Sequence, residues 1–400
     1  MIFKMAFRNI FRHKRRTFLT SLMMLGGYCL ISFSLSLVDG SYGNLIRFFT
    51  SQKTGHLQIH HKKYVETESI HDNIKNYKQI SSGLSKDRLV EAFSPRIKSG
   101  ALAFKKEKAV GVQLIGIDWT KEALVTTIKK RLEKGHWPSS QLKNEVIIGG
   151  KIAKVLNLNL GDELILISQG ADGSIANDIF YVKAIFQSED QALDDYSVYT
   201  DLSSAQSFFS TKAIQEIAIK LKRIDFASKF AKSFNPGENL VIRPWQKIEE
   251  EFFRAMEVDK KGNTVSYIII MIVVALGILN SVLMSILERI KEFGVLKAIG
   301  TSPKNLIMMI IMEAQFIAII SVIFGAILSF FINLYFVKYG ISLSEPMTYG
   351  GMFISHIFAE ITPRCFIQPA LIVFGTSFLV SLYPAFKSAR VSPVEALREN

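Results

Sequence analysis

The stretch VSYIIIMIVVALGILNSVLMSIL, residues 265–287, runs directly into ERIKEFGVLKAIG, residues 288–300, and together they decide the fold. The first part contains no Asp, Glu, Lys or Arg. Because an α-helix rises about 1.5 Å per residue, about 20 apolar residues cross the hydrocarbon core of a bilayer. The second part mixes charged side chains with large apolar ones. The pattern predicts a membrane-spanning helix that ends in an amphipathic segment at the membrane surface.

Three further stretches have the same character. The chain has 400 residues, of which 49% are hydrophobic and 30 are Phe, which is too apolar for an ordinary soluble protein. Residues 17–38 and 365–386 carry no charge, and residues 306–337 carry one, Glu313. All three are long enough to span a membrane, and the third is long enough to tilt. The sequence therefore predicts four membrane spans and one sizeable globular domain.

Basic residues orient these spans. The first sixteen residues carry six Lys and Arg and no acidic residue. Short segments rich in Lys and Arg stay in the cytoplasm, so both termini are predicted to be cytoplasmic. A cleaved signal sequence is the alternative for the first span, but its apolar run is long and Val38-Asp39-Gly40-Ser41 is a poor cleavage site. The predicted order is an interfacial helix (1–16), span 1 (17–38), an extracytoplasmic α/β domain (39–264), span 2 (265–287), a cytoplasmic segment (288–305), span 3 (306–337), an extracytoplasmic loop (338–364), span 4 (365–386) and a cytoplasmic tail (387–400).

The interfacial helix rests on a stripe formed by Phe3, Phe7, Ile10 and Phe11, and the alternative is the start of one continuous helix. The large domain shows mixed α and β patterns between two helical stalks, one over residues 41–50 and one from Gln246 onward, which the polar run 259–263 could interrupt. Strands are predicted at 55–60, 109–117, 145–148, 163–168, 178–186, 214–221 and 239–243, and helices at 151–156 and 201–209.

Catalytic and metal chemistry find no support in the sequence. His56 and His60 share one strand face, but no Cys, Asp or Glu at ligand spacing accompanies them, so a partly exposed strand face is favoured over a metal site. Gly149-Gly150-Lys151 lacks the spacing of an ATP-binding loop. The two cysteines, Cys29 and Cys365, lie in or beside spans, which leaves the domain without a disulfide.

The net charge of +13 gathers at the membrane-flanking ends, where anionic lipids attract it. No basic stripe with interleaved aromatic residues suggests nucleic-acid binding. We therefore expect no enzyme activity, no metal, no cofactor in this chain and no nucleic-acid partner.

Glu313 is the one carboxylate within a span, which makes it a candidate polar site. Ser302 and Pro303 form a good helix start, so Glu313 lies about 15 Å along the third span, near headgroup level. Structural pairing with a nearby Lys or Arg is favoured over proton or substrate handling.

The amphipathic segment predicts a docking helix, since apolar side chains on the soluble side are costly unless a partner covers them. Phe293, Val295 and Leu296 are expected to enter a groove on a separate ATPase, while Glu292 and Lys297 fix the register. The complete set of expected coupling residues is Glu288, Arg289, Glu292, Phe293, Gly294, Val295, Leu296, Lys297 and Gly300.

Two long motifs carry a resemblance. NSVLMSILERIKEFGVLKAIG (280–300) and YPAFKSARVSPVEALR (383–398) resemble signatures of FtsX/MacB/LolC-type ABC permeases. The opening FRNIFRHKRRT (7–17) and the strand GHLQIH (55–60) resemble the lipoprotein-releasing (LolC/LolE-like) branch. The resemblance covers essentially the whole chain.

The resemblance implies a permease dimer, with a second copy or a paralogue, bound to two ATPase subunits that hold ATP and Mg²⁺. Residues 288–305 would be the coupling helix, and the outer domain a porter-like core plus an inserted subdomain, facing the periplasm from the bacterial inner membrane. ATP binding would drive the domain by mechanotransmission to extract lipoproteins or related lipidated cargo from the outer leaflet.

Two alternatives stay open: a MacB-like efflux permease, and an FtsX-like subunit that regulates an extracytoplasmic partner without transport. An FtsX-like protein would usually have a smaller outer domain. A periplasmic carrier or adaptor is a further expected partner, although the hairpin 169–177 is short and lacks the proline of the LolC carrier-binding loop.

Overall fold

The computed structural model describes residues 6, 8, 14–138, 144–188, 190–349 and 352–390. Most of the predicted interfacial helix and the last ten residues therefore lie outside the described residues. The chain divides into two compact units, which are described separately. One unit comprises residues 1–44, 256–343 and 356–400, and the other comprises residues 45–255 and 344–355.

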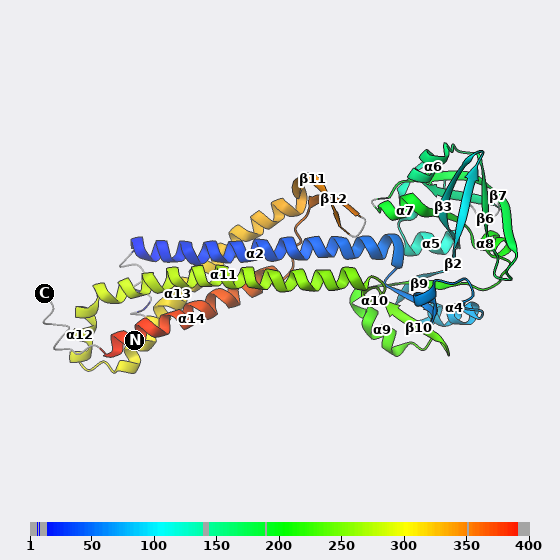
Figure 1. The fold of residues 1–400 in the computed structure, drawn as a ribbon. Coiled ribbons are helices and arrows are strands. Elements are labelled where there is room, and N and C mark those ends of the chain that lie inside the picture. Colours follow the sequence, from blue (N-terminus) through cyan, green and yellow to red (C-terminus); the bar gives the residue numbers. More distant parts are fainter. Residues whose placement is uncertain are drawn as a thin grey trace. The chain divides into compact units, whose positions relative to one another are not determined.

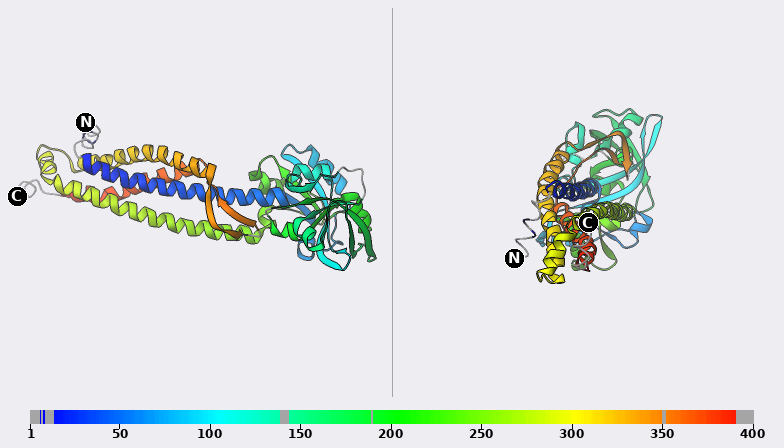
Figure 2. Two further views of the ribbon diagram at one scale, coloured as in Figure 1. Left: turned by 90° about the horizontal axis from the view of Figure 1, so that it is seen from above. Right: turned by 90° about the vertical axis from the view of Figure 1, so that its left-hand side faces the viewer.

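Four long helices lie alongside one another in the first unit (Figures 1 and 2). Each is long and apolar enough to cross a membrane. A mixed α/β domain is inserted between the first and the second of them, so the predicted fold class is confirmed. The helices are α2 (Lys14–Phe49), α11 (Glu250–Glu288), α13 (Pro303–Tyr339) and α14 (Arg364–Arg390).

All four helices contribute to one apolar cluster. Small residues let the helices approach closely, as is typical of membrane bundles. A Cβ atom added to Gly27 of α2 would overlap Val274 of α11, and one added to Gly325 of α13 would lie 2.9 Å from the ring of Tyr28. The buried members of the cluster are Met24, Tyr28, Val274, Ile278, Ile317, Ala318 and Val373.

A short helix, α12 (Ile290–Ala298), joins α11 to α13. Ser302 caps α13, since its side-chain oxygen accepts a hydrogen bond from the backbone N–H of Asn305 at 3.4 Å, and a proline stands in the first turn. The predicted helix start is thus confirmed. Gly300 has a φ of +100°, a conformation that side chains other than glycine rarely adopt.

Six strands of the α/β domain close into a barrel. The strands pair in the order β2-β3-β8-β5-β7-β6, and β6 pairs again with β2. Closure leaves no free edge inside the ring, and buried Val, Ile, Leu, Phe and Ala side chains fill it. The strands are β2 (Val90–Lys105), β3 (Lys108–Ile117), β5 (Glu145–Gly149), β6 (Glu163–Gln169), β7 (Ile175–Phe186) and β8 (Ser197–Asp201).

A second lobe extends from the first half of β2. There β2 pairs with β9, β9 pairs with β1, and β1 pairs with β10. Helices α4 and α9 supply Leu84 and Phe230 to the apolar core of this lobe. Its elements are β1 (Leu57–His61), β9 (Glu216–Leu221), β10 (Leu240–Pro244), α4 (Tyr77–Lys86) and α9 (Ala227–Ser233).

The remaining elements are short. Trp119 and Trp137 pack edge to face outside the barrel, in an apolar cluster with residues of β3, β5, β7 and β8. The remaining short elements are a π-helical turn η1 (Thr50–Thr54), α3 (Tyr64–Thr67), α5 (Trp119–Val125), η2 (Ile128–Arg131), β4 (Leu132–Gly135), α6 (Gly150–Leu156), α7 (Gln191–Tyr196), α8 (Leu202–Phe208), η3 (Ile224–Phe226), α10 (Trp245–Ile248), β11 (Ile341–Tyr349) and β12 (Met352–Ile357).

The predicted strands and both predicted helices of the domain are present, each within a few residues. The expected interruption of the second stalk at 259–263 is wrong, because α11 runs through that segment. Its one glycine, Gly262, costs about 1 kcal/mol relative to alanine, and no proline removes a hydrogen bond. Strands β2, β4 and β8 and the hairpin β11–β12 were not predicted. Strand β2 was hidden because Pro95, Gly100 and its charged residues interrupt the apolar alternation.

Candidate functional site

Arg289 stands at the corner where α11 ends and α12 begins. Its side chain is only 5% exposed, and its guanidinium group lies 5.2 Å from the centre of the Phe293 ring. Nε donates to Glu292 Oε2 at 3.0 Å, one turn further along the chain. A buried guanidinium needs such partners, since an uncompensated buried charge is strongly destabilising.

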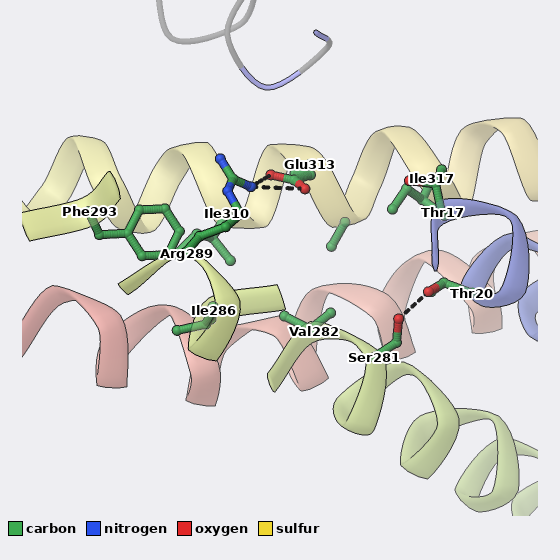
Figure 3. Close-up of a pocket in the computed structure, with 11 residues that line it drawn as sticks. Thr17, Thr20, Ser281, Val282, Ile286, Arg289, Phe293, Ile310, Glu313 and Ile317 are labelled. Carbon is green, nitrogen blue, oxygen red and sulfur yellow. Dashed lines mark hydrogen bonds and ion pairs between the residues drawn. The ribbon is translucent and has the colours of Figure 1, made fainter. Parts of the chain in front are cut away.

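The second partner of Arg289 is Glu313 on α13. Nη1 of Arg289 donates to Glu313 Oε2 at 3.1 Å and to Oε1 at 3.4 Å. Figure 3 shows the arginine side chain reaching from the corner to the carboxylate on the neighbouring helix. The carboxylate in the third span is therefore paired with an arginine, as the sequence favoured, and the pair ties the corner to α13.

Polar side chains from α2 and α11 complete the surroundings of this pair. Thr20 and Ser281 are hydrogen-bonded to each other, and Thr17 also lines the cavity (Figure 3). The cavity measures about 40 Å³, which holds small solvent molecules and no cargo of the size of a lipid. The geometry supports a structural link between α2, α11, α13 and α14, because α14 contributes Ala385 to an apolar cluster directly beside this cavity.

That neighbouring apolar cluster contains Phe293, which is 1% exposed. The expectation that Phe293 enters a groove on a partner ATPase is wrong for this conformation, because its ring is already buried within the chain. Leu296 packs partly against the same cluster, and Gly294 is buried beside it. These residues hold α12 in place. The buried members are Ala6, Ile286, Phe293, Leu306, Met309, Ile310 and Ala385.

The outward face of α12 carries a different set of residues. Lys291, Val295, Ala298 and Ile299 are exposed, at spacings of four, seven and eight residues that place them on one helical face. Val295 is 43% exposed and Ile299 is 79% exposed. This outward stripe is the surface that a docking partner would meet. The sequence singled out Val295 but missed Ala298 and Ile299, although their spacing was readable.

Lys297 holds the other end of α12. Its Nζ donates to the backbone carbonyl of Ala389, in the last turn of α14, at 2.9 Å. The polar residues expected to set the register with a partner, Glu292 and Lys297, thus make bonds inside the chain. Together with the Arg289–Glu313 pair, they orient α12 relative to α13 and α14. Glu288 and Gly300, at the two ends of the segment, are exposed.

A second polar site lies in the α/β domain, where the first long helix ends. The last turn widens into η1, and two of its carbonyls are held by the domain. The backbone N–H of Thr127 donates to the carbonyl of Ser51 at 2.8 Å, and Arg96 Nη1 donates to that of Lys53 at 2.7 Å. Gly55 has a φ of +68° and lets the chain turn from this helix into β1.

Arg96 is the centre of a buried ionic network. It makes a two-pronged contact with Glu122 of α5, at 3.0 and 2.7 Å, and a third contact with Glu216 of β9 at 2.6 Å. Lys98 Nζ donates to the other oxygen of Glu216 at 2.6 Å. Although burial raises the pKa of Glu216, the Lys98 and Arg96 charges outweigh it and lower that pKa to about 2. Burial lowers the pKa of Lys98 even though the Glu216 charge acts to raise it. The cost of burying the ammonium group therefore offsets part of the stabilisation from the Lys98–Glu216 ion pair.

The network continues through Gln58 to His60. Gln58 Nε2 donates to Glu216 Oε1 at 3.1 Å, so the Gln58 carbonyl oxygen is left to accept from His60 Nε2 at 2.9 Å. Burial lowers the pKa of His60 to about 4, so the imidazole is neutral at physiological pH. The expectation of a partly exposed strand face is wrong for His60, which is 4% exposed. Among the residues that the structure describes, no cluster of metal-binding side chains occurs.

Comparison with known families decides the identity. Residues 17–235 match the MacB-like periplasmic core domain, and residues 264–393 match the FtsX-like permease C-terminal domain. The chain belongs to the FtsX/MacB/LolC family of ABC transporter permeases. The first match covers more than half of the permease, and the second contains α12 and the Arg289–Glu313 pair.

Relatives of the permease include the lipoprotein-releasing system transmembrane protein LolC of Neisseria meningitidis, 21% identical over 77% of this chain and 78% of that protein. The macrolide export ATP-binding/permease protein MacB of Campylobacter jejuni is 23% identical over 99% of this chain and 61% of that protein. Among solved structures, the periplasmic region of MacB from Actinobacillus actinomycetemcomitans matches with a TM-score of 0.37 at 15% identity, covering 50% of this chain and 92% of that one.

Proposed function

We propose that the permease is a mechanotransmission subunit that extracts lipoproteins or related lipidated cargo from the outer leaflet of the inner membrane, with its large domain in the periplasm. A separate ATPase, with ATP and Mg²⁺, supplies the energy, and two copies act on a permease dimer. The observation that carries the coupling is the fixed orientation of α12, whose exposed stripe combines Lys291 with three apolar residues while its other face is anchored in the bundle.

The anchoring contacts support transmission of force. A docking helix attached by a flexible loop would absorb a push, whereas α12 is bonded to α13 through Arg289 and Glu313 and to α14 through Lys297. Movement of the stripe Lys291, Val295, Ala298 and Ile299 would therefore move both helices. Separating Arg289 from Glu313 would leave a buried charge without its partner, so the pair opposes movement of α12 relative to α13.

The network at the end of the first long helix supports the proposal that the long helices move the α/β domain. The backbone carbonyls of Ser51 and Lys53 accept hydrogen bonds from Thr127, in the turn that follows α5, and from Arg96 of β2. Lys53 also forms an ion pair with Glu249, at 3.5 Å, just before α11 begins. The domain thus holds the end of one long helix and the start of the other, which suits a domain that is moved by them.

The cargo class rests on the relatives. Several of them are named as lipoprotein-releasing transmembrane proteins, and the N. meningitidis LolC matches over most of both chains. MacB-like efflux is the second candidate, because the C. jejuni MacB matches 99% of this chain and residues 17–235 match the MacB-like core. An FtsX-like signalling role is the third, in which the domain moves but nothing is transported.

Reconstitution into proteoliposomes with the cognate ATPase separates these functions. A lipidated protein is placed in the same membrane, and ATP hydrolysis and release of that protein from the vesicles are measured together. Lipid extraction predicts that the lipidated protein stimulates hydrolysis and leaves the vesicles only with ATP, while its non-lipidated form does neither. Stimulation by a macrolide or peptide with no release of lipoprotein would favour efflux. Nucleotide-dependent movement of the domain without any release would favour signalling.

A further inference from the structure

A cavity of about 170 Å³ lies where α2, α11 and α14 meet, near the end of the apolar run of α2 and near the starts of the apolar runs of α11 and α14. Its position relative to a membrane follows from the charges. Asp39 follows the first apolar run, Lys260 precedes the second and Arg364 precedes the fourth. Three helices thus change from polar to apolar at one level, which marks the membrane–water interface.

The cavity has a polar end and an apolar end. Along α11, residues 260, 263, 264, 267, 268 and 271 lie on one helical face, and along α14 residues 364, 368 and 372 do the same. The α11 series begins with Lys, Asn and Thr and ends with Ile and Met. The α14 series begins with Arg and Gln and ends with Ile. A ligand that matches this order has a polar, negatively charged head and an apolar chain that points into the membrane.

The cationic groups at the polar end retain binding capacity. Arg364 donates to Asp39 Oδ1 at 3.2 Å and to Gln368 Oε1 at 3.1 Å, which leaves further N–H groups of a guanidinium that has five. The ammonium group of Lys260 lies 5.4 Å from the centre of the Tyr42 ring, and no ion pair of Lys260 occurs among the described residues. Two cations against one carboxylate leave an excess of one positive charge.

Tyr267 gives an independent sign of a missing ligand. Its side chain is 8% exposed and lines the cavity, yet its hydroxyl group has no hydrogen-bond partner in the part of the chain that the structure describes. A buried hydroxyl without a partner costs free energy, so such groups usually face a ligand or water. The hydroxyl can donate to an oxygen atom of a bound head group.

We propose that this cavity binds the phosphate head group of an anionic phospholipid, with one acyl chain along Ile268, Met271 and Ile372. Arginine and lysine bind the phosphate oxygens, and the Tyr267 hydroxyl donates to the phosphate or to the adjoining glycerol. The single excess positive charge suits a head group with a net charge of −1, whereas the ammonium group of a choline lipid would be repelled. The lipid would hold α11 against α14 at the level where α11 leaves the membrane. This proposal is independent of the cargo.

The test is native mass spectrometry of the full permease purified in mild detergent. Phosphatidylglycerol or phosphatidylcholine with the same acyl chains is added at equal concentration, and retained lipids are counted. We expect the wild type to retain phosphatidylglycerol preferentially. Lys260→Gln should weaken retention roughly tenfold, since a charge-assisted contact is lost. Tyr267→Phe should weaken it by about threefold or more.

Lys261→Gln is the matched control, because it removes the same charge one residue away, where the side chain is exposed and does not line the cavity. It should retain phosphatidylglycerol like the wild type. If Lys260→Gln does not fold, the nearly isosteric Tyr267→Phe decides the question. Equal retention of both lipids by the wild type, or unchanged retention in Tyr267→Phe and Lys260→Gln, would overturn the proposal. Displacement of phosphatidylglycerol by excess inorganic phosphate would also overturn it, since the site would then bind a soluble anion rather than a lipid.

Discussion

Truncation of Ile299 separates a docking surface from a structural helix. The side chain is 79% exposed in the isolated chain, so Ile299→Ala should change the free energy of unfolding by no more than about 0.5 kcal/mol. Burying an isoleucine side chain in a partner's groove contributes about 1.5–3 kcal/mol, of which alanine keeps a small part. Losing about 2 kcal/mol corresponds to a roughly 30-fold weaker affinity for the ATPase.

Phe293→Ala should behave in the opposite way. Its ring is 1% exposed among apolar side chains of α11, α13 and α14, so truncation should destabilise the permease by about 3–5 kcal/mol. Weaker ATPase binding would then follow from loss of the helix rather than of a contact. Ile299→Ala should therefore lower the affinity for the ATPase without lowering the stability of the permease, whereas Phe293→Ala should lower its stability. This difference distinguishes a docking residue from a structural one.

The assay is the dissociation constant of the purified ATPase for the permease in nanodiscs, measured beside the thermal unfolding of the permease. Ile269→Ala is the matched control, since Ile269 is 57% exposed on α11 within the apolar run and does not belong to α12. It should leave the affinity unchanged. An Ile299→Ala permease that binds the ATPase as tightly as the wild type would refute the docking role of the outward stripe.

Three further predictions concern the bundle, the α/β domain and the topology. Glu313→Gln should lower stability by about 1–3 kcal/mol and reduce cargo-stimulated ATP hydrolysis more than ATPase recruitment, because buried Arg289 then keeps only Glu292 as an ionic partner among the described residues; an equal loss of hydrolysis and of recruitment would contradict this. His60 has a pKa lowered from 6.5 to about 4, so its contribution to stability is complete above pH 6.5 and is lost as pH falls through about 4; the loss of stability should reach about 3 kcal/mol and should be absent in His60→Asn, as pH-dependent hydrogen exchange of β1 would show. A cysteine at Ser203 should react with an impermeant reagent from the periplasmic side while one at Thr301 should not, and labelling of Thr301 in spheroplasts would reverse the predicted orientation.

The sequence predicted local features well because their signals are local. The start of α13 at Ser302 and Pro303 required only a capping oxygen and a fixed φ angle, and both are visible in a few letters. Strand β1 followed from alternation over six residues. Strand β2 could not be predicted in this way, since its polar residues are stabilised by partners such as Glu216, which lies more than a hundred positions away.

Sequence alone thus determined the four membrane helices, the insertion of the domain between the first two and the amphipathic segment after the second, because the length of an apolar run and its charges suffice to place a helix in a membrane. Only the tertiary structure decided which face of α12 is buried, that Arg289 pairs with Glu313, and that Arg96 joins Glu122 to Glu216. These features depend on how separate helices and strands pack against one another, which no local pattern of residues shows. The sequence does not show whether a charged side chain faces water or a buried partner. Its burial in the tertiary structure does, and a buried charge requires a partner.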